Sequence, residues 1–167
     1  MNTNLIPRIE SIFFQADAFN LAAQKLQSGV PNIPLMVAQI VNSSFSSELY
    51  LKCIILIETG NAPRGHDLRK LFGQLKDESK QVIENEWNAE HAKKSAALDE
   101  IDRRSGSPVT PRNLKVALAG EGNAFEKWRY AHEPGPLSGF WLGNLPAILR
   151  RHILTIRPEL QHRPVKW

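Results

Sequence analysis

The sequence predicts an all-helical protein, and two observations support this prediction. Apolar residues recur every three or four positions along most of the chain, which is the period of a helix that buries one face. No segment alternates polar and apolar residues over the length of a strand, and no Asn-Gly or Asp-Gly pair marks a tight hairpin. We therefore predict an up-and-down bundle of four to five main helices with a short extra helix.

The composition is that of one globular domain covering residues 1–167, with 42% hydrophobic and 23% charged residues. Cys53 is the only cysteine, so no internal disulfide can form and a reducing compartment is expected. No basic leader precedes an apolar stretch, and the most apolar run, Leu49–Ile57, is about half the length that crosses a bilayer. We expect a cytoplasmic protein with no membrane partner.

The helical period places the predicted helices at residues 9–26, 34–59, 67–76, 78–98, 112–130 and 140–156. The second is nearly continuously apolar in its second half and is expected to be central. Within it Glu48 and Lys52 stand one turn apart and can form an ion pair. Asp67 is suited to cap the short third helix. We predict a break at Gly60, a second break over residues 133–139 and an irregular tail at 157–167.

The segment 103–111 contains two prolines, one glycine and the adjacent Arg103 and Arg104, a composition typical of a mobile loop. With Arg112 and Lys115 nearby, these arginines are expected to add positive charge to the surface. The formal net charge of +4 permits an RNA or DNA partner without requiring one. An ordinary solvated loop explains the same charges equally well.

Sequence motifs for metals and cofactors are absent. The chain has no Cys-x-x-Cys, His-Glu-x-x-His, P-loop or Gly-x-Gly-x-x-Gly, and no two of its histidines stand at metal-ligand spacing on one predicted helix. We therefore expect no metal and no cofactor.

The stretch Trp128–Glu133 concentrates the most chemistry in the chain. Arg129 and His132 can share one helical face, where an arginine can bind a phosphate and a histidine can move a proton near neutral pH. Glu133 lies four residues after Arg129, so an internal Arg129–Glu133 salt bridge, with Trp128 and Tyr130 packing the helix end, is the simpler interpretation.

Three blocks in this order resemble the HEPN family of bacterial and archaeal helical domains. They are Ser47–Leu56 with Gly60, Gly65–Leu68 with Leu71 and Leu75, and Phe125 with Trp128–Glu133. The resemblance implies a helical bundle and a homodimer whose two copies form a cleft. It also implies an RNA-directed function, because many members are metal-independent ribonucleases of toxin–antitoxin and defence systems.

In those ribonucleases an arginine and a histidine separated by four to six residues meet the partner's pair across the dimer cleft. Here only two residues separate Arg129 from His132. Arg157 and His162 have four residues between them, but a proline follows the arginine directly. The Trp-Arg-Tyr form with a following Glu133 therefore resembles a branch that lacks the nuclease motif.

Three functional hypotheses follow. The first is a non-catalytic homodimer that binds RNA, a nucleotide or a partner protein, with Tyr130, Glu133, Arg103, Arg104, Lys52 and Glu48 as candidate binding residues. The alternative is a ribonuclease in which Arg129 holds the phosphate, His132 acts as general acid or base, and Tyr130 or Glu133 orients them. The third is a helical adaptor for a separate nucleotidyltransferase.

Overall fold

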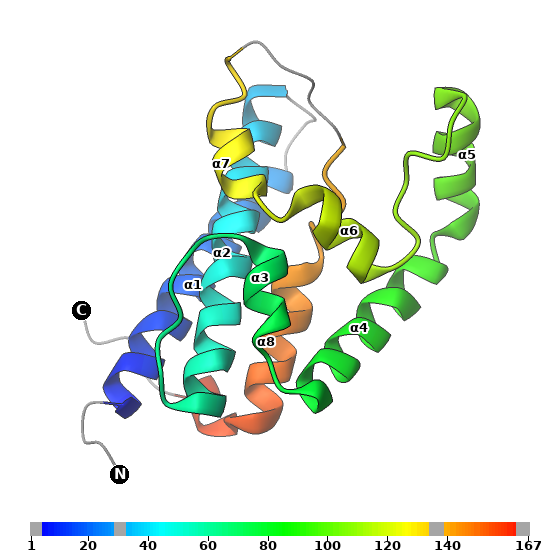
Figure 1. Ribbon diagram of the computed structural model, residues 1–167. Coiled ribbons are helices and arrows are strands. Elements are labelled where there is room, and N and C mark those ends of the chain that lie inside the picture. The colour runs from blue at the N-terminus through cyan, green and yellow to red at the C-terminus, as the bar shows by residue number, and fades with distance from the viewer. Residues whose placement is uncertain (1–4, 29–32, 134–138, 163–167) are drawn as a thin grey trace.

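A computed structural model describes residues 5–28, 33–133 and 139–162 of the chain, and all of its regular structure there is helical (Figure 1). The elements are α1 (Leu5–Gln27), α2 (Ile33–Thr59), α3 (Leu68–Gly73), α4 (Asp77–Ala92), α5 (Ser95–Ser105), α6 (Leu114–Glu121), α7 (Ala124–Arg129), α8 (Leu145–Ile156) and the 3-10 helix η1 (Pro158–His162). The predicted fold class, a helical bundle, is confirmed.

Helix α2 lies at the centre of the bundle, where α1, α3, α7 and α8 all pack against it (Figure 1). Every residue from Ser46 to Leu51 is buried, because neighbours cover this helix on all sides. Its apolar side chains join those of α1, α3, α4, α6 and α8 in one cluster of buried residues. A second, smaller cluster forms where Trp128 and Ala124 of α7 meet Ile40 of α2.

Helix α2 is also long and apolar enough, by length and composition alone, to cross a membrane. The apolar segment spans Leu35–Thr59 and is longer than the run that the sequence pattern indicated. Most of this apolar segment, 72% of its most apolar part, is buried inside the described protein, as expected for the core helix of a bundle.

The predicted helix 78–98 is wrong in its length, because the chain turns at Lys93 and Lys94 between α4 and α5. Both lysines are exposed and contribute no apolar side chain that would hold a continuous helix against the core. Beyond the turn, α5 extends away from the bundle (Figure 1) and buries only Leu98.

The predicted helix 112–130 is also two helices, α6 and α7, which meet at Gly122 and Asn123. The break lies where α3 begins, since the backbone N–H of Leu68 donates to the carbonyl of Gly122 at 2.8 Å. A Cβ atom at position 122 would lie 2.7 Å from Oδ1 of Asp67. A side chain at this position would therefore displace the Asp67 carboxylate that caps α3.

The predicted mobile loop 103–111 has different bounds in the structure. Arg103, predicted to begin the mobile loop, belongs to α5, which closes at Gly106 with a positive φ of 70°. Asp102 then holds the following segment by accepting the backbone N–H groups of Val109 and Thr110, each at 2.9 Å. The loop is therefore anchored to α5.

The predicted last helix begins at Leu145, five residues later than expected, with Pro146 in its first turn. Part of the predicted irregular tail, Pro158–His162, is a 3-10 helix. The rest of the tail, residues 163–167, and most of the predicted break before Gly139 lie outside the described residues.

Asp17 of α1 connects three helices. Its carboxylate accepts the hydroxyl of Tyr50 on α2 and two N–H groups of Arg150 on α8, at 2.9 and 3.1 Å. Tyr50 is fully buried, so its hydroxyl depends on this acceptor for hydrogen bonding.

We expect Asp17→Ala to lower the free energy of unfolding by about 2–3 kcal/mol, because the substitution leaves the buried Tyr50 hydroxyl without an acceptor. Urea denaturation measures this change. Asp77→Ala is the control, since Asp77 forms only a surface pair with Lys80. An equal shift of the two urea midpoints would contradict the linking function of Asp17.

Candidate functional site

The structure brings Glu48, Lys52 and His66 together at the edge of the core. Oε1 of Glu48 accepts Nζ of Lys52 at 2.8 Å and lies 2.9 Å from Nδ1 of His66. The Glu48–Lys52 pair that helical spacing predicted is therefore confirmed. Glu48 is only 1% exposed, whereas the side chain of His66 is 57% exposed. A buried carboxylate thus holds an imidazole at the surface.

The local sequence explains how His66 reaches Glu48. Gly65 has a positive φ of 93°, which lets the chain turn sharply before α3. Asp67 then caps α3 by accepting the backbone N–H of Lys70 at 3.1 Å, as predicted. Because a carboxylate can only accept, Nδ1 of His66 is the donor, and Nε2 remains uncommitted to Glu48. That nitrogen accepts when the ring is neutral and donates when it is protonated.

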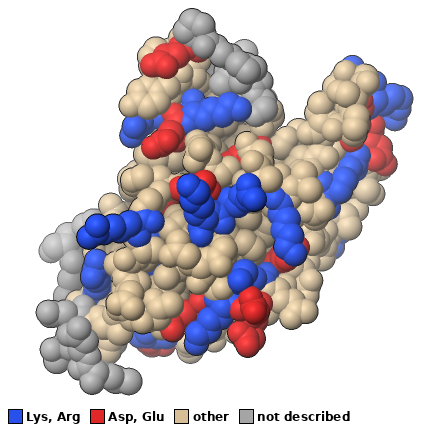
Figure 2. Space-filling model, in the orientation of Figure 1, with Lys and Arg blue, Asp and Glu red and all other residues tan. Residues whose placement is uncertain are grey.

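Basic side chains gather next to this cluster. Figure 2 shows Lys and Arg side chains across the middle of the face on which α3 lies. Arg64 on the segment that leads into α3, and Arg69 and Lys70 on α3 itself, are all exposed. We call these three residues the α3 basic surface. Among the described residues no carboxylate forms an ion pair with any of the three.

Most other arginines of the chain are neutralised by acidic partners. Ion pairs engage Arg103, Arg104, Arg112, Arg150, Arg151 and Arg157. The predicted binding residues Arg103 and Arg104 both pair with Glu100, at 2.6 Å from its Oε1 in the case of Arg104. The sequence pattern therefore predicted binding residues whose charge Glu100 offsets, and it did not predict the α3 basic surface.

The predicted catalytic residues Arg129 and His132 lie at the exposed end of α7. The guanidinium of Arg129 lies 4.9 Å from the centroid of the Tyr130 ring and donates to the Tyr130 hydroxyl at 3.0 Å. The Tyr130 ring is in turn 6.3 Å from the ring of His132. These three side chains form one exposed group, which we call the α7 group.

The simpler interpretation of this stretch, an internal Arg129–Glu133 salt bridge, is not what the described residues form. Arg129 is exposed and contacts Tyr130 and the ring of Phe125, whereas Glu133 is exposed and forms no ion pair with it. Trp128 is buried as predicted, but Tyr130 is 47% exposed and does not pack the helix end. The additional helical turn that would place Arg129 and Glu133 on one face does not form, because α7 ends at Arg129.

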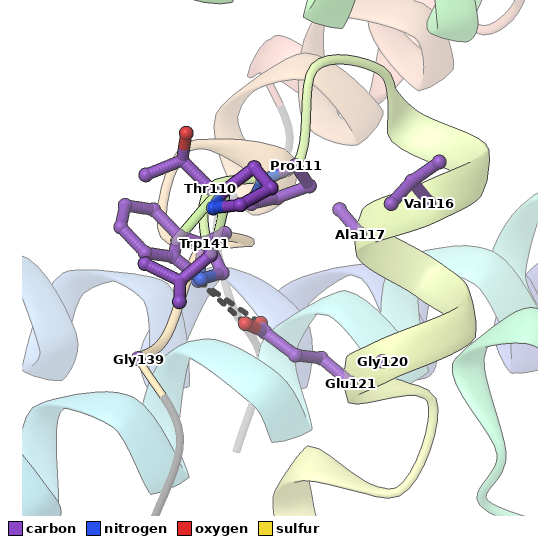
Figure 3. A pocket seen from close by; sticks show the side chains of 10 residues that line it. Thr110, Pro111, Val116, Ala117, Gly120, Glu121, Gly139 and Trp141 are labelled. Carbon is purple, nitrogen blue, oxygen red and sulfur yellow. Dashed lines mark hydrogen bonds between the residues drawn. The ribbon is translucent and has the colours of Figure 1, made fainter. Parts of the chain in front are cut away.

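Two further buried ionisable groups line cavities, and no sequence motif marked either. His91 of α4 lines one cavity. Glu121 lies at the end of α6 in a pocket of about 210 Å³ (Figure 3), where its carboxylate accepts the backbone N–H of Trp141 at 2.9 and 3.0 Å. Burial raises the pKa of Glu121 to about 7, although the N–H groups of Trp141 and Leu142 oppose this shift.

Within the described residues no three His, Cys, Asp or Glu side chains gather closely enough to hold a metal ion. The fold and the Glu48–Lys52–His66 cluster together define a helical-bundle domain with a surface imidazole held by a buried acid.

A protein-family model of the HEPN domain matches residues 17–105, which is more than half of the chain. The chain therefore belongs to the HEPN family. The matched region runs from α1 to the end of α5 and includes the Glu48 cluster and the α3 basic surface, but it ends before the α7 group. No curated protein and no solved structure matches the chain.

The contact between Glu48 and His66 is testable by a double-mutant cycle with Glu48→Gln and His66→Ala. We expect a coupling energy of at least about 0.5 kcal/mol in urea denaturation, because the two side chains share one hydrogen bond. A cycle of Glu48→Gln with Lys93→Ala, on the turn between α4 and α5, serves as the control. Coupling of the same size in both cycles would contradict the contact.

The raised pKa of Glu121 predicts how stability depends on pH. Between about pH 4.5, its ordinary pKa, and about pH 7, the folded state keeps a proton that the unfolded state releases. Stability therefore falls as pH rises through this window, by at most about 1.4 kcal/mol per pH unit. Glu121→Gln should remove this fall and make the protein relatively more stable above pH 7. Parallel pH profiles of stability for wild type and variant would disprove the prediction.

Proposed function

We propose that this HEPN domain is a cytoplasmic, non-catalytic homodimer that binds RNA through the α3 basic surface. The observation that supports the proposal most directly is the contrast among the cations of the chain. Arg64, Arg69 and Lys70 have no acidic partner among the described residues, whereas the arginines of α5 and α8 do. Exposed cations without ion-pair partners are free to contact phosphates and release counterions.

The neighbouring cluster supports the same proposal. Glu48 fixes the orientation of His66 beside the α3 basic surface, so a hydrogen-bonding group of defined geometry accompanies the three cations. Lys52 offsets the charge of Glu48, which keeps a buried negative charge from weakening phosphate binding nearby. Membership of the HEPN family favours an RNA-related function and a dimer.

The alternative proposal is a metal-independent ribonuclease that uses the α7 group. One observation favours it. Arg129, Tyr130 and His132 are exposed at the end of α7, which packs against α2 (Figure 1). Leu35 and Met36 in the first turn of α2 are also exposed. A homodimer formed through this end would bring two α7 groups together. A homodimer formed through this end of the bundle is also compatible with the third hypothesis, a helical adaptor for a separate nucleotidyltransferase.

The RNA-binding proposal is tested with the triple variant Arg64→Gln, Arg69→Gln and Lys70→Gln and a short oligouridylate. We expect the variant to bind more weakly and the slope of log affinity against log salt to fall by about 2, at about 0.7 per lost phosphate contact with a single strand. Fluorescence anisotropy between about 50 and 200 mM salt measures both quantities.

The matched control is Arg103→Gln with Arg104→Gln, which removes charges that Glu100 already offsets. This variant should bind RNA nearly as well as the wild type. A larger loss in the control than in the triple variant would place the binding surface on α5 and refute the proposal.

The nuclease alternative is tested by incubating the wild type and the Arg129→Ala/His132→Ala variant with the same oligouridylate. The main proposal expects no cleavage by the wild type beyond that by the double variant. Cleavage that disappears in the double variant would establish the ribonuclease instead. Sedimentation velocity on both proteins shows whether the expected dimer is present in each case.

A further inference from the structure

The cavity that His91 lines lies away from the α3 basic surface and uses different residues. It has a volume of about 420 Å³ and is lined by residues of α1, α2, α4 and α5, by Lys94 in the turn between α4 and α5, and by residues 140–147. Its walls carry amides from Asn20, Gln24, Gln27, Gln39 and Asn144. A cavity of this size and polarity suits a small organic molecule.

Two buried polar side chains in its wall have no hydrogen-bond partner. Both ring nitrogens of His91 and the hydroxyl of Ser43 are buried and unpaired among the described residues, although His91 is only 6% exposed and Ser43 only 2%. Buried polar groups are normally hydrogen-bonded, so each unpaired group lowers the stability of the fold. Two such side chains from different helices line one cavity, which indicates that the cavity serves to bind a ligand.

The packing of His91 keeps it in this position. Its ring stacks on Trp87 with centroids 3.7 Å apart and planes inclined by 16°, so the imidazole is held flat against the indole. Burial lowers the pKa of His91, and the charges of Lys94 and Arg112 lower it further. The neutral ring offers one N–H donor and one nitrogen acceptor.

The charged side chain in the cavity wall favours an anion. Among the described residues Lys94 lines the cavity and no aspartate or glutamate lines it, although the carboxylate of Glu90 accepts the amide of the wall residue Asn144 at 2.9 Å. Helix α5 begins directly after Lys94 and has no side-chain cap, which places the positive end of the helix next to this lysine. The rings of Phe140 and Trp141 also line the cavity and favour a planar molecule.

We propose that this cavity binds a small heteroaromatic carboxylate whose ring carries both hydrogen-bond donors and acceptors. The ring groups pair with His91 and Ser43, and the carboxylate lies toward Lys94 and the start of α5. We expect a ligand with one negative charge, because the positive groups near the cavity are one lysine and the start of one helix. This proposal does not depend on RNA binding, because it shares no residue with the α3 basic surface or the α7 group.

The test uses three probes with the full-length protein in isothermal titration calorimetry. Orotate has a ring with donors and acceptors and a carboxylate, uracil has the same ring without the carboxylate, and benzoate has a carboxylate on a ring without such groups. We expect orotate to bind most tightly and to raise Tm by mass action. Absence of orotate binding at millimolar concentration, or equal affinity for orotate and benzoate, would refute the proposal.

Variants assign the binding to these residues. His91→Phe preserves the stacked ring and removes both unpaired nitrogens, so it should keep or raise Tm and lower orotate affinity about tenfold or more. Lys94→Gln should weaken the binding of orotate and leave the binding of uracil unchanged. Lys93→Gln, at the preceding residue, should change neither affinity. Unaltered orotate affinity in both His91→Phe and Lys94→Gln would overturn the assignment.

One measurement needs no variant. The ¹⁵N resonances of the His91 imidazole in the wild type report which nitrogen carries the proton. Orotate should shift at least one of the two resonances, because a new hydrogen bond at either ring nitrogen changes the proton distribution of the imidazole. Resonances that stay unchanged at saturating orotate would contradict the proposed contact.

Discussion

The burial of α2 on all sides is the constraint on which the rest of the structure depends. A helix enclosed by α1, α3, α7 and α8 must satisfy every polar group that it carries, because water cannot reach them. Residues Ser43–Glu48 nevertheless include four serines and one glutamate. Two of these side chains, Ser43 and Glu48, mark the two candidate sites. The polar segment of the central helix therefore connects the core to the functional surfaces.

The polar groups of α2 are satisfied to different degrees, since the hydroxyls of Ser43 and Ser44 are unpaired and those of Ser46 and Ser47 are paired. The hydroxyl of Ser46 donates to the carbonyl of Ala16 on α1 at 2.9 Å, and that of Ser47 donates to the backbone carbonyl of Ser43 within α2 at 3.0 Å. The first bond stabilises the α1–α2 packing, and each hydroxyl has an acceptor. Glu48 instead holds the partly exposed His66, and the hydroxyl of Ser43 is left unpaired beside the cavity.

The distribution of charge over the surface follows from how the helices pack. The arginines of α8 meet acidic residues of α1 and α4, as in the pairs Arg150–Asp17 and Arg151–Glu90, and so contribute little net field. Helix α3 is short, and its acidic neighbour Asp67 caps the backbone N–H of Lys70. The cations of the α3 basic surface therefore remain available to a polyanion, although the net charge of the chain is only +4.

The sequence by itself determined the features that depend on neighbours along the chain. Helical periodicity gave the fold class, the spacing of Glu48 and Lys52 gave their ion pair, and the motif blocks gave the family. The tertiary structure alone decided the rest, because Asp17 meets Arg150 across 133 positions and His91 shares a cavity with Ser43 of another helix. Packing also divided the helix expected at 112–130, where Gly122 contacts the start of α3. Local patterns cannot specify such contacts, since they depend on how the helices are placed in space.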